Sequence, residues 1–213
     1  MWTHLIWDFN GTIYDDIEAG WMSINALLLS RGLAALPTLS DYRAHFGFPV
    51  EKYYRELGFD VDGEGFDILA HDWLAEYLRI SRNAGLRDGV LPVIDALSAR
   101  GVTQLVLSAS EINMLSRQLA GLGIADRFEA VLGLGDIYAR SKVDVARRWR
   151  ETHPESRPLF VGDTLHDAET AAEIGADCVL VCGGHQSKER LMEAGVEVID
   201  SFAELLQLPR MPH

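Results

Sequence analysis

The chain has 213 residues, with 48% hydrophobic and 24% charged side chains, a composition ordinary for a soluble globular protein of one large domain, with or without an insert. Its 32 acidic residues against 19 basic ones give a net charge of −13, which argues against nucleic acid and anionic membrane surfaces as partners. The N-terminus lacks a signal-peptide pattern, and no apolar run is long enough to cross a bilayer, so we expect a cytoplasmic protein.

The first predicted element is a buried strand that ends at an aspartate. In "HLIWDFNGT" the apolar run stops at Asp8, and Asn10, Gly11 and Thr12 follow. A carboxylate at this position can accept a phosphoryl group as a nucleophile, and a glycine turn lets backbone N–H groups approach an anion. Taken alone, Asp8 is equally consistent with a helix or turn cap.

The segment that follows has helical periodicity throughout and contains no good strand candidate. Runs such as "EAGWMSINALLLSRG" and "FDILAHDWLAEYLRIS" place apolar residues at helical spacing, and Gly, Pro and Asp punctuate them. We therefore predict an all-helical domain over residues 16–83, inserted into a core domain made of residues 1–15 and 84–213.

From about Leu91 onward, strand-like runs alternate with amphipathic helical stretches. "VTQLVLSAS" predicts a strand ending at Ser108 with a helix directly after it, and "PLFVGD" predicts a strand ending at Asp163. Such alternation is typical of right-handed βαβ units. The predicted fold class is α/β, a Rossmann-like parallel sheet with helices on both faces and an inserted helical cap.

Several polar residues fall where an open α/β sheet collects its ligands, at the carboxyl ends of strands. Asp163 and Asp167 in "GDTLHD", with Asp8 in reach, form an oxygen-rich set suited to Mg²⁺. Ser108 precedes a predicted helix, whose N-terminus favours phosphate. Lys142 stands near a helix start, where a cation is unfavourable unless an anion lies close. Each of the last three residues also has a purely structural explanation. Asp167 and Ser108 can be helix caps, and Lys142 can be a solvated surface residue.

In this order the motifs resemble those of the haloacid dehalogenase-like (HAD) superfamily, over nearly the whole chain. "DFNGT" is similar to the first motif, usually DxDGT, and "GDTLHD" to the fourth, while Ser108 and Lys142 match the second and third. The inserted segment is similar to the small helical cap of the phosphoglycolate phosphatase-like subgroup.

The resemblance implies a role for each matched residue. Asp8 would be the catalytic nucleophile, Ser108 and Lys142 would take part in catalysis, and Asp163 and the backbone carbonyl of Asn10 would bind Mg²⁺ together with Asp8, with Asp167 in support. The residues expected to hold or shape the phosphate site are Gly11, Thr12, Ser108, Ala109 and Lys142. Phosphoryl transfer depends mainly on such positioning and charge neutralisation.

The chain departs from the family at Asn10. In the family's phosphatases this position is an aspartate that protonates the leaving group and later activates water. An amide does neither near neutral pH, and general acid–base catalysis is typically worth ~10²–10⁴ in rate. The expected enzyme is therefore a slow Mg²⁺-dependent phosphatase that works through an aspartyl-phosphate on a small phosphorylated metabolite.

Three explanations of Asn10 remain open in the sequence. In the first, the enzyme acts on esters with good leaving groups, such as acyl or aryl phosphates. In the second, it cleaves a carbon–phosphorus bond as phosphonoacetaldehyde hydrolases do, with Lys52 forming a Schiff base. In the third, it is a non-catalytic protein that binds a phosphorylated ligand or a protein partner. An asparagine introduced by engineering to trap a bound ligand belongs with this third explanation. Dehalogenases are set aside because they replace the "GD" motif, which is intact here.

The sequence does not identify the substrate. Its choice is expected to depend on residues of the helical segment such as Arg43, His45, Phe46 and Tyr53. A monomer or homodimer is expected, with no nucleic-acid or membrane partner.

Overall fold

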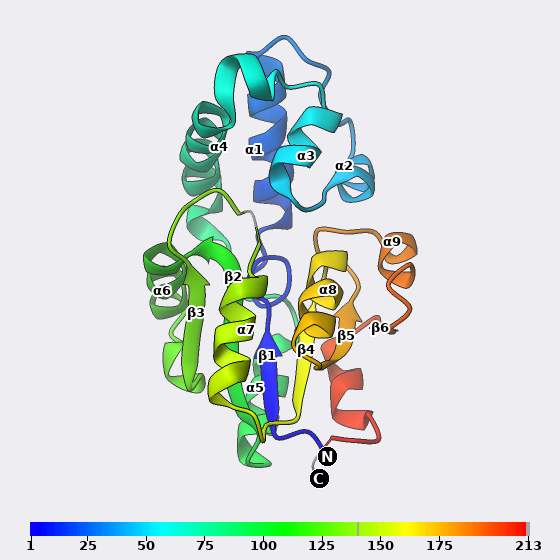
Figure 1. Cartoon of the computed structure of the whole chain (residues 1–213). Coiled ribbons are helices and arrows are strands. Elements are labelled where there is room, and N and C mark those ends of the chain that lie inside the picture. The colour runs from blue at the N-terminus through cyan, green and yellow to red at the C-terminus, as the bar shows by residue number, and fades with distance from the viewer. Residues whose placement is uncertain (140, 212–213) are drawn as a thin grey trace.

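The computed structural model describes residues 1–139 and 141–211, and it has two parts, a sheet flanked by helices and a helical segment above it (Figure 1). The strands of the described chain are β1 (His4–Trp7), β2 (Thr103–Glu111), β3 (Ala130–Leu134), β4 (Pro158–Gly162), β5 (Asp177–Val181) and β6 (Glu197–Ile199). The α-helices of the sheet part are α5 (Val90–Ala99), α6 (Ile112–Gly121), α7 (Val143–Thr152), α8 (Leu165–Glu173) and α9 (Lys188–Met192). Short 3-10 turns complete it at η2 (Ser81–Asn83), η3 (Ala125–Arg127) and η4 (Phe202–Gln207).

The sheet has the order β3-β2-β1-β4-β5-β6, and all its strand pairs are parallel. This is the Rossmann-like arrangement that the sequence predicted, so the fold class is confirmed. β1 lies between β2 and β4, where the strand order reverses. The carboxyl ends of β1 and β4 are therefore the place where ligands of such sheets collect.

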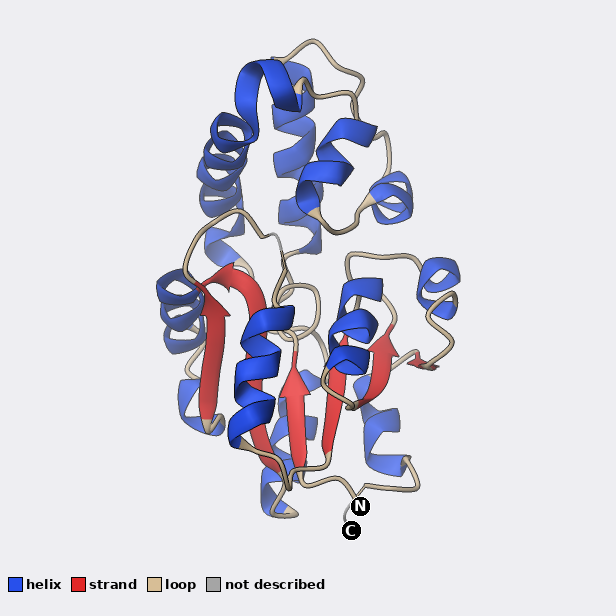
Figure 2. Ribbon diagram, in the orientation of Figure 1, coloured by secondary structure: helices blue, strands red, loops and turns tan. Residues whose placement is uncertain are grey.

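Alternate residues of the central strands feed two separate hydrophobic clusters. Leu5 and Trp7 pack with α5 and α6 on one face, while Ile6 packs with α7 and α8 on the other. All three side chains are fully buried. Helices cover both faces (Figure 2), which explains why these strands read as unbroken apolar runs.

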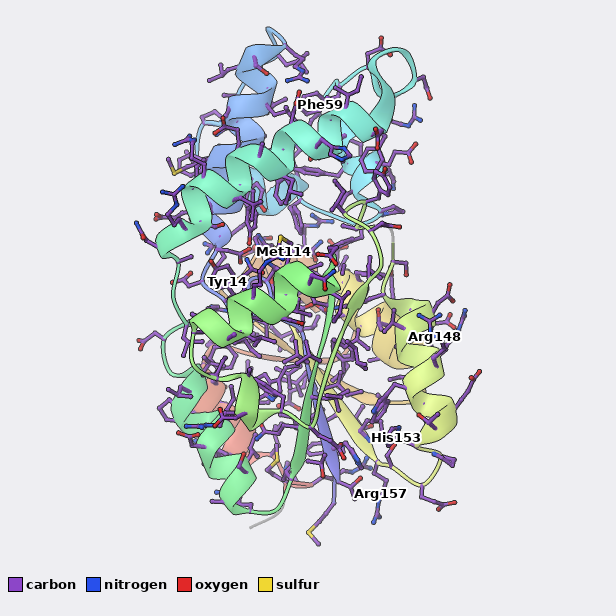
Figure 3. The ribbon with its side chains drawn as sticks, turned by 90° about the vertical axis from the view of Figure 1, so that its left-hand side faces the viewer. Tyr14, Phe59, Met114, Arg148, His153 and Arg157 are labelled. Atoms are coloured by element: carbon purple, nitrogen blue, oxygen red, sulfur yellow. The ribbon has the colours of Figure 1, made fainter. Side chains whose placement is uncertain are left out.

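The helical segment consists of α1 (Ile17–Ser30), α2 (Leu39–His45), α3 (Val50–Glu56), the π-helical turn η1 (Val61–Gly65) and α4 (Phe66–Ile80). It has a hydrophobic cluster of its own, which includes Leu28, Tyr54 and Leu69, and Phe59 marks this cluster in Figure 3. No strand occurs among its residues, all of which have a described backbone. The division into a 16–83 cap domain and a discontinuous core domain stays a prediction.

The two chain crossings between the parts lie side by side. The N–H of Asp15 donates to the carbonyl of Gly85 at 2.9 Å, and Tyr14 forms an antiparallel bridge with Leu86. The entry and exit of the helical segment are thus paired with each other next to β1. Among the described residues, no helix has both the length and the apolarity that a membrane span requires.

The boundary predicted at Ser108 is wrong. β2 continues to Glu111, and α6 begins at Ile112 with the Glu111 carboxylate capping it through the N–H groups of Asn113 and Met114. Pairing with β3 is interrupted between Leu107 and Glu111. Ser108 therefore lies in a distorted strand end, not at a helix N-terminus.

Candidate active site

Asp8, the first residue after β1, is buried beside a buried lysine. Lys142, the N-cap residue of α7, is only 2% exposed, and its Nζ contacts Asp8 Oδ1 and lies 2.6 Å from Asp167 Oδ1. Burial lowers the pKa of Lys142, but the charges of Asp167 and Asp8 raise it more, so the net direction is upward. The amine is a fixed positive charge against the two carboxylates, and the surface alternative for Lys142 is excluded.

Asp167 both caps α8 and joins the charged cluster. Its Oδ2 accepts hydrogen bonds from the N–H groups of Asp163 and Thr164 at 3.0 and 2.9 Å and from the Thr164 hydroxyl at 2.7 Å. Burial raises the pKa of Asp167, but Lys142 outweighs that and holds it below its usual value. The helix-cap explanation is therefore correct for Asp167, and its functional role stays a prediction.

Asp163 follows β4 and has no exposed surface. Its Oδ1 accepts from the Thr12 hydroxyl at 2.7 Å, and its Oδ2 accepts from the N–H of His185 at 2.6 Å. Gly11 (φ 72°) and Gly184 allow this close packing, since a Cβ at either position would collide with the Asp163 carboxylate. Three loops thus close around one carboxylate.

The donor set fits a hard divalent cation. Ligand oxygens of Asp8, Asp163 and Asp167 lie within 4.8 Å of one another, and all three residues are buried. Burial and, to a smaller extent, the neighbouring Asp167 raise the pKa of Asp8 and of Asp163, while Lys142 opposes the rise at Asp8 and His185 opposes it at Asp163. The three carboxylates thus carry an excess of negative charge. A cation bound by oxygen ligands would remove this excess.

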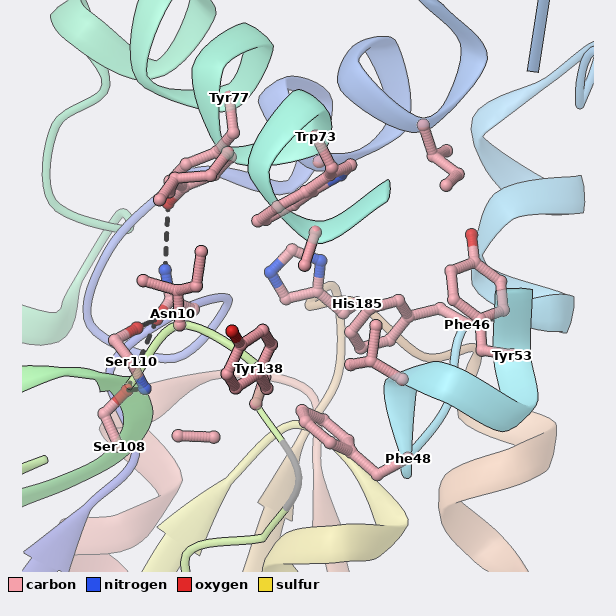
Figure 4. A pocket seen from close by; sticks show the side chains of 18 of the residues that line it. Asn10, Phe46, Phe48, Tyr53, Trp73, Tyr77, Ser108, Ser110, Tyr138 and His185 are labelled. Carbon is pink, nitrogen blue, oxygen red and sulfur yellow. Dashed lines mark hydrogen bonds between the residues drawn. The ribbon is translucent and has the colours of Figure 1, made fainter. Parts of the chain in front are cut away.

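Asn10 lies at the centre of a hydrogen-bond network that joins the two parts of the protein. Its Nδ2 donates to Asp16 Oδ2 at 2.8 Å and to the Tyr77 hydroxyl at 2.9 Å, and its Oδ1 accepts from the Ser110 hydroxyl at 2.7 Å. Figure 4 shows Asn10 between Tyr77 of α4 and the serines of β2. The amide therefore uses both its donor and its acceptor sides.

Asp16 is the carboxylate to which the Asn10 amide donates a hydrogen bond. It is 1% exposed and also accepts from the N–H of Gly11 at 2.8 Å and from the Tyr77 hydroxyl at 2.6 Å, and His185 Nε2 lies 3.2 Å from its Oδ1. Burial raises the pKa of Asp16, but His185 and the hydrogen bonds lower it further than that. Asp16 is therefore held as a carboxylate.

A cavity of about 120 Å³ opens between the sheet part and the helical segment. The core residues that line it include Asp8, Asn10, Ser108, Ala109 and Lys142. Its opposite wall comes from the helical segment, with Phe46, Phe48, Tyr53 and Trp73 among the lining residues seen in Figure 4. Met114, at the junction of the two parts in Figure 3, also lines it.

Known proteins match the chain along most of its length. The family model described as haloacid dehalogenase-like hydrolase matches residues 5–181. The chain belongs to this family. It is thus an enzyme of the hydrolase class, and the family resemblance inferred from the motifs is confirmed.

Relatives within the family carry different names. The chain is 26% identical to a phosphoglycolate phosphatase of Rhodobacter capsulatus, over 85% of each chain. It is 29% identical to the tyrosine-protein kinase PtkA of Mycobacterium tuberculosis, over 96% of this chain and 70% of the relative. A haloacid dehalogenase-like hydrolase from Streptococcus pneumoniae has the same fold, with a TM-score of 0.82 at 17% identity and 97% coverage of both chains.

The structure brings the family's motif residues together and separates other candidates from them. Asp8, Ser108, Lys142, Asp163 and Asp167 gather at one end of the sheet. Of the substrate-choice candidates, Phe46 and Tyr53 line the cavity. Two do not: His45 is exposed, and Arg43 instead donates to the carbonyls of Gly183 and Gly184, both at 2.8 Å.

Lys52 lies outside the cavity between the sheet part and the helical segment. Its side chain is 73% exposed and pairs with Glu56 at 3.7 Å on the surface of α3. It is not among the residues that line the cavity. A Schiff-base lysine must reach the substrate, so this placement speaks against the carbon–phosphorus alternative.

Sequence reasoning missed His185, Asp16 and Tyr77. His185 is 6% exposed and lines the cavity. Its position just after a predicted strand, in "VCGGHQ", was the available signal. No sequence signal pointed to Tyr77, because its hydrogen-bond partners lie 61 and 67 residues away in the chain.

Proposed function

We propose that the protein is a Mg²⁺-dependent phosphatase that transfers the phosphoryl group of a small phosphorylated metabolite to Asp8 and then to water. The observation that carries the proposal is the buried cluster of Asp8, Lys142, Asp163 and Asp167 at the carboxyl ends of adjacent strands. The phosphatases among the relatives support a phosphoric monoester as the substrate. A cytoplasmic location and a monomeric or homodimeric state stay predictions.

The cation would be held by the carboxylates of Asp8 and Asp163 and the backbone carbonyl of Asn10. That carbonyl accepts no hydrogen bond from any described residue, which leaves it available as a ligand. When bound, Mg²⁺ would neutralise negative charge on the nucleophile and the phosphoryl oxygens. Asp167 would act mainly by holding Lys142 in place.

In the first step a carboxylate oxygen of Asp8 attacks phosphorus, and the bond from phosphorus to the ester oxygen breaks with its electron pair leaving on that oxygen. Lys142 offsets the charge of the attacking carboxylate, since it already contacts Asp8. Ser108 and the N–H of Ala109 line the same cavity and are assigned to the phosphoryl oxygens. In the second step water attacks phosphorus, the acyl-phosphate bond breaks with its electron pair returning to the Asp8 carboxylate, and the proton of the water passes to solvent.

Asn10 makes the two steps unequal. It gives the leaving oxygen no acidic proton and gives the attacking water no base. A leaving group such as a phenol departs without much help, whereas water attack stays slow. The aspartyl-phosphate on Asp8 is therefore expected to accumulate with such substrates.

The test is a pre-steady-state assay with 4-nitrophenyl phosphate and Mg²⁺. We expect a burst of nitrophenolate of about one equivalent per active site, followed by slow turnover. Acid-quenched protein should carry a phosphate that hydroxylamine removes, and Asp8→Asn should abolish burst, label and turnover. An Asp8→Asn variant that keeps wild-type turnover would show that the nucleophile is misassigned.

The helical segment is assigned the role of a cap that closes over the substrate. Its contacts with the sheet part support a closed arrangement: Tyr42 bonds His185 at 2.8 Å, and Gln186 donates to the carbonyl of Phe46 at 2.9 Å. Closure over the cavity would exclude water from the first step. The non-catalytic alternative predicts ligand binding without the burst, so the same assay separates the two.

A further inference from the structure

The wall of the cavity formed by the helical segment is uncharged. Every residue of α1–α4 and their connections that lines the cavity has a neutral side chain, and most of these are aromatic. Phe48 and Trp73 show the character of this wall: Phe48 stacks on His166 with ring centroids 4.7 Å apart, and Trp73 stacks on Tyr77 at 4.8 Å. Both rings are thus fixed in place by neighbours.

The charged groups on the opposite wall are already paired. Lys142 is held between Asp8 and Asp167, and His185 faces Asp16. The remaining charged lining residue is Glu111, an anion. Among the described residues, no cation of the cavity is left to receive a second negative group on the substrate, such as the carboxylate of phosphoglycolate.

The size of the cavity limits the substrate further. Its volume is about 120 Å³. An engineered apolar cavity of about 150 Å³ holds one benzene molecule. The cavity, its Asp8 end included, is therefore too small for a group larger than a single ring.

We propose that the substrate is the phosphomonoester of a neutral alcohol or phenol with one aromatic ring, whose ring lies against Phe48 and Trp73. This inference rests on the proposed function, because it takes the Asp8 end of the cavity as the phosphate site. For the phenol esters of this class it also explains how a site with Asn10 works, since phenolic leaving groups need little acid.

Binding of non-hydrolysable phosphonates in the presence of Mg²⁺ tests the inference without turnover. Methylphosphonate reports the phosphate site alone, benzylphosphonate adds a ring, and phosphonoacetate adds a carboxylate. Calorimetry should find benzylphosphonate bound at least tenfold more tightly than methylphosphonate, and phosphonoacetate no more tightly than methylphosphonate. Tighter binding of phosphonoacetate than of benzylphosphonate would overturn the substrate class.

The two levels of the proposal fail differently in this experiment. If methylphosphonate shows no Mg²⁺-dependent binding, the proposed function is wrong. If methylphosphonate binds and the ring adds nothing, the phosphate site stands and the aromatic substrate class is wrong.

Substitutions in the cavity wall test where the ring binds. Trp73→Ala and Phe48→Leu should each reduce the benzyl preference at least fivefold and leave methylphosphonate binding unchanged. Two substitutions are used so that a loss of folding in one does not decide the result. The matched control is Leu78→Ala, on the same helix as Trp73 but 46% exposed and outside the cavity, which should change neither affinity. An unchanged benzyl preference in both cavity variants would contradict the assigned ring position.

Discussion

The two walls of the cavity follow different physical rules. The sheet wall contains buried charges that are each fixed by partners from several loops, as Asp163 is by Thr12 and His185. The helical wall presents neutral rings such as Phe48 and Trp73. Charged groups act strongly on a reacting phosphoryl group, whereas apolar surface acts by area and shape. We therefore expect the sheet wall to determine the reaction and the helical wall to select the substrate.

The largest effect is expected from Lys142→Met on the sheet wall. The substitution leaves Asp8 and Asp167 buried without their cation, and removing one partner of a buried ion pair typically costs about 3–5 kcal/mol. Turnover should fall by ~10²-fold or more, since the charge on the nucleophile and phosphate is no longer offset. Thermal or urea unfolding measures the first effect and the phosphatase assay the second.

Lys188→Met is the matched control. Lys188 pairs with Asp200 at 2.7 Å, but its side chain is 47% exposed. Surface pairs are typically worth about 0–1 kcal/mol, so stability should change little and activity not at all. Equal losses in the two lysine variants would mean that burial of Lys142 has no special consequence.

The next effect concerns Asn10 and Asp16 as a pair. Asn10→Asp alone removes the donors to Asp16 and Tyr77 and places a second carboxylate where Nδ2 lies 2.8 Å from the Asp16 oxygen. Repulsion between the two carboxylates would misplace the new one. We therefore expect the single variant to gain little activity, although it restores the residue usual in the family.

Asn10→Asp combined with Asp16→Asn should behave differently. The amide then stands at position 16 and can donate to the new carboxylate, which reverses the present arrangement. Turnover should exceed that of either single variant by about tenfold or more, a coupling within the range for residues in direct contact. Additive effects in this double-mutant cycle would show that Asp16 is not the reason for the amide.

A smaller effect is expected where the walls touch. Arg43 of α2 donates to the carbonyls of Gly183 and Gly184, in the loop that packs against Asp163. Hydrogen bonds from charged groups contribute roughly 1.5–3 kcal/mol, less where solvent competes, as at this part-buried site. Arg43→Gln should therefore raise amide hydrogen exchange in the loop about tenfold. Arg148→Gln, on an exposed face of α7, should leave that exchange unchanged.

The sheet wall was far more predictable from the sequence than the helical wall. Asp8, Lys142 and Asp163 stand at strand or helix ends, positions that alternation and motif order locate without knowing the packing. Ser108 was found in the right place but in the wrong element, because the interruption of the β2–β3 pairing leaves no trace in local hydrophobicity. Ser108 nevertheless lines the same cavity as Asp8.

The helical wall could be predicted only as helices. Phe46 and Tyr53 proved to line the cavity, whereas Arg43 and His45 did not, and helical periodicity does not distinguish these cases. The network around Asn10 was missed for a related reason. Its partners Asp16 and Tyr77 come together only when α4 packs against α1, so their roles depend on tertiary contacts.

The smallest effect is expected from Lys52→Ala, which tests whether the helical wall contributes any chemistry. Lys52 is exposed and, among the described residues, pairs with Glu56 alone, so its loss should change stability by less than about 0.5 kcal/mol and turnover by less than about twofold. Incubation with phosphonoacetaldehyde and borohydride should attach nothing to Lys52, as peptide mass spectrometry can establish. A borohydride-stable adduct on this lysine, lost in Lys52→Ala, would place reactive chemistry on the helical wall and end the division of labour argued for the two sides.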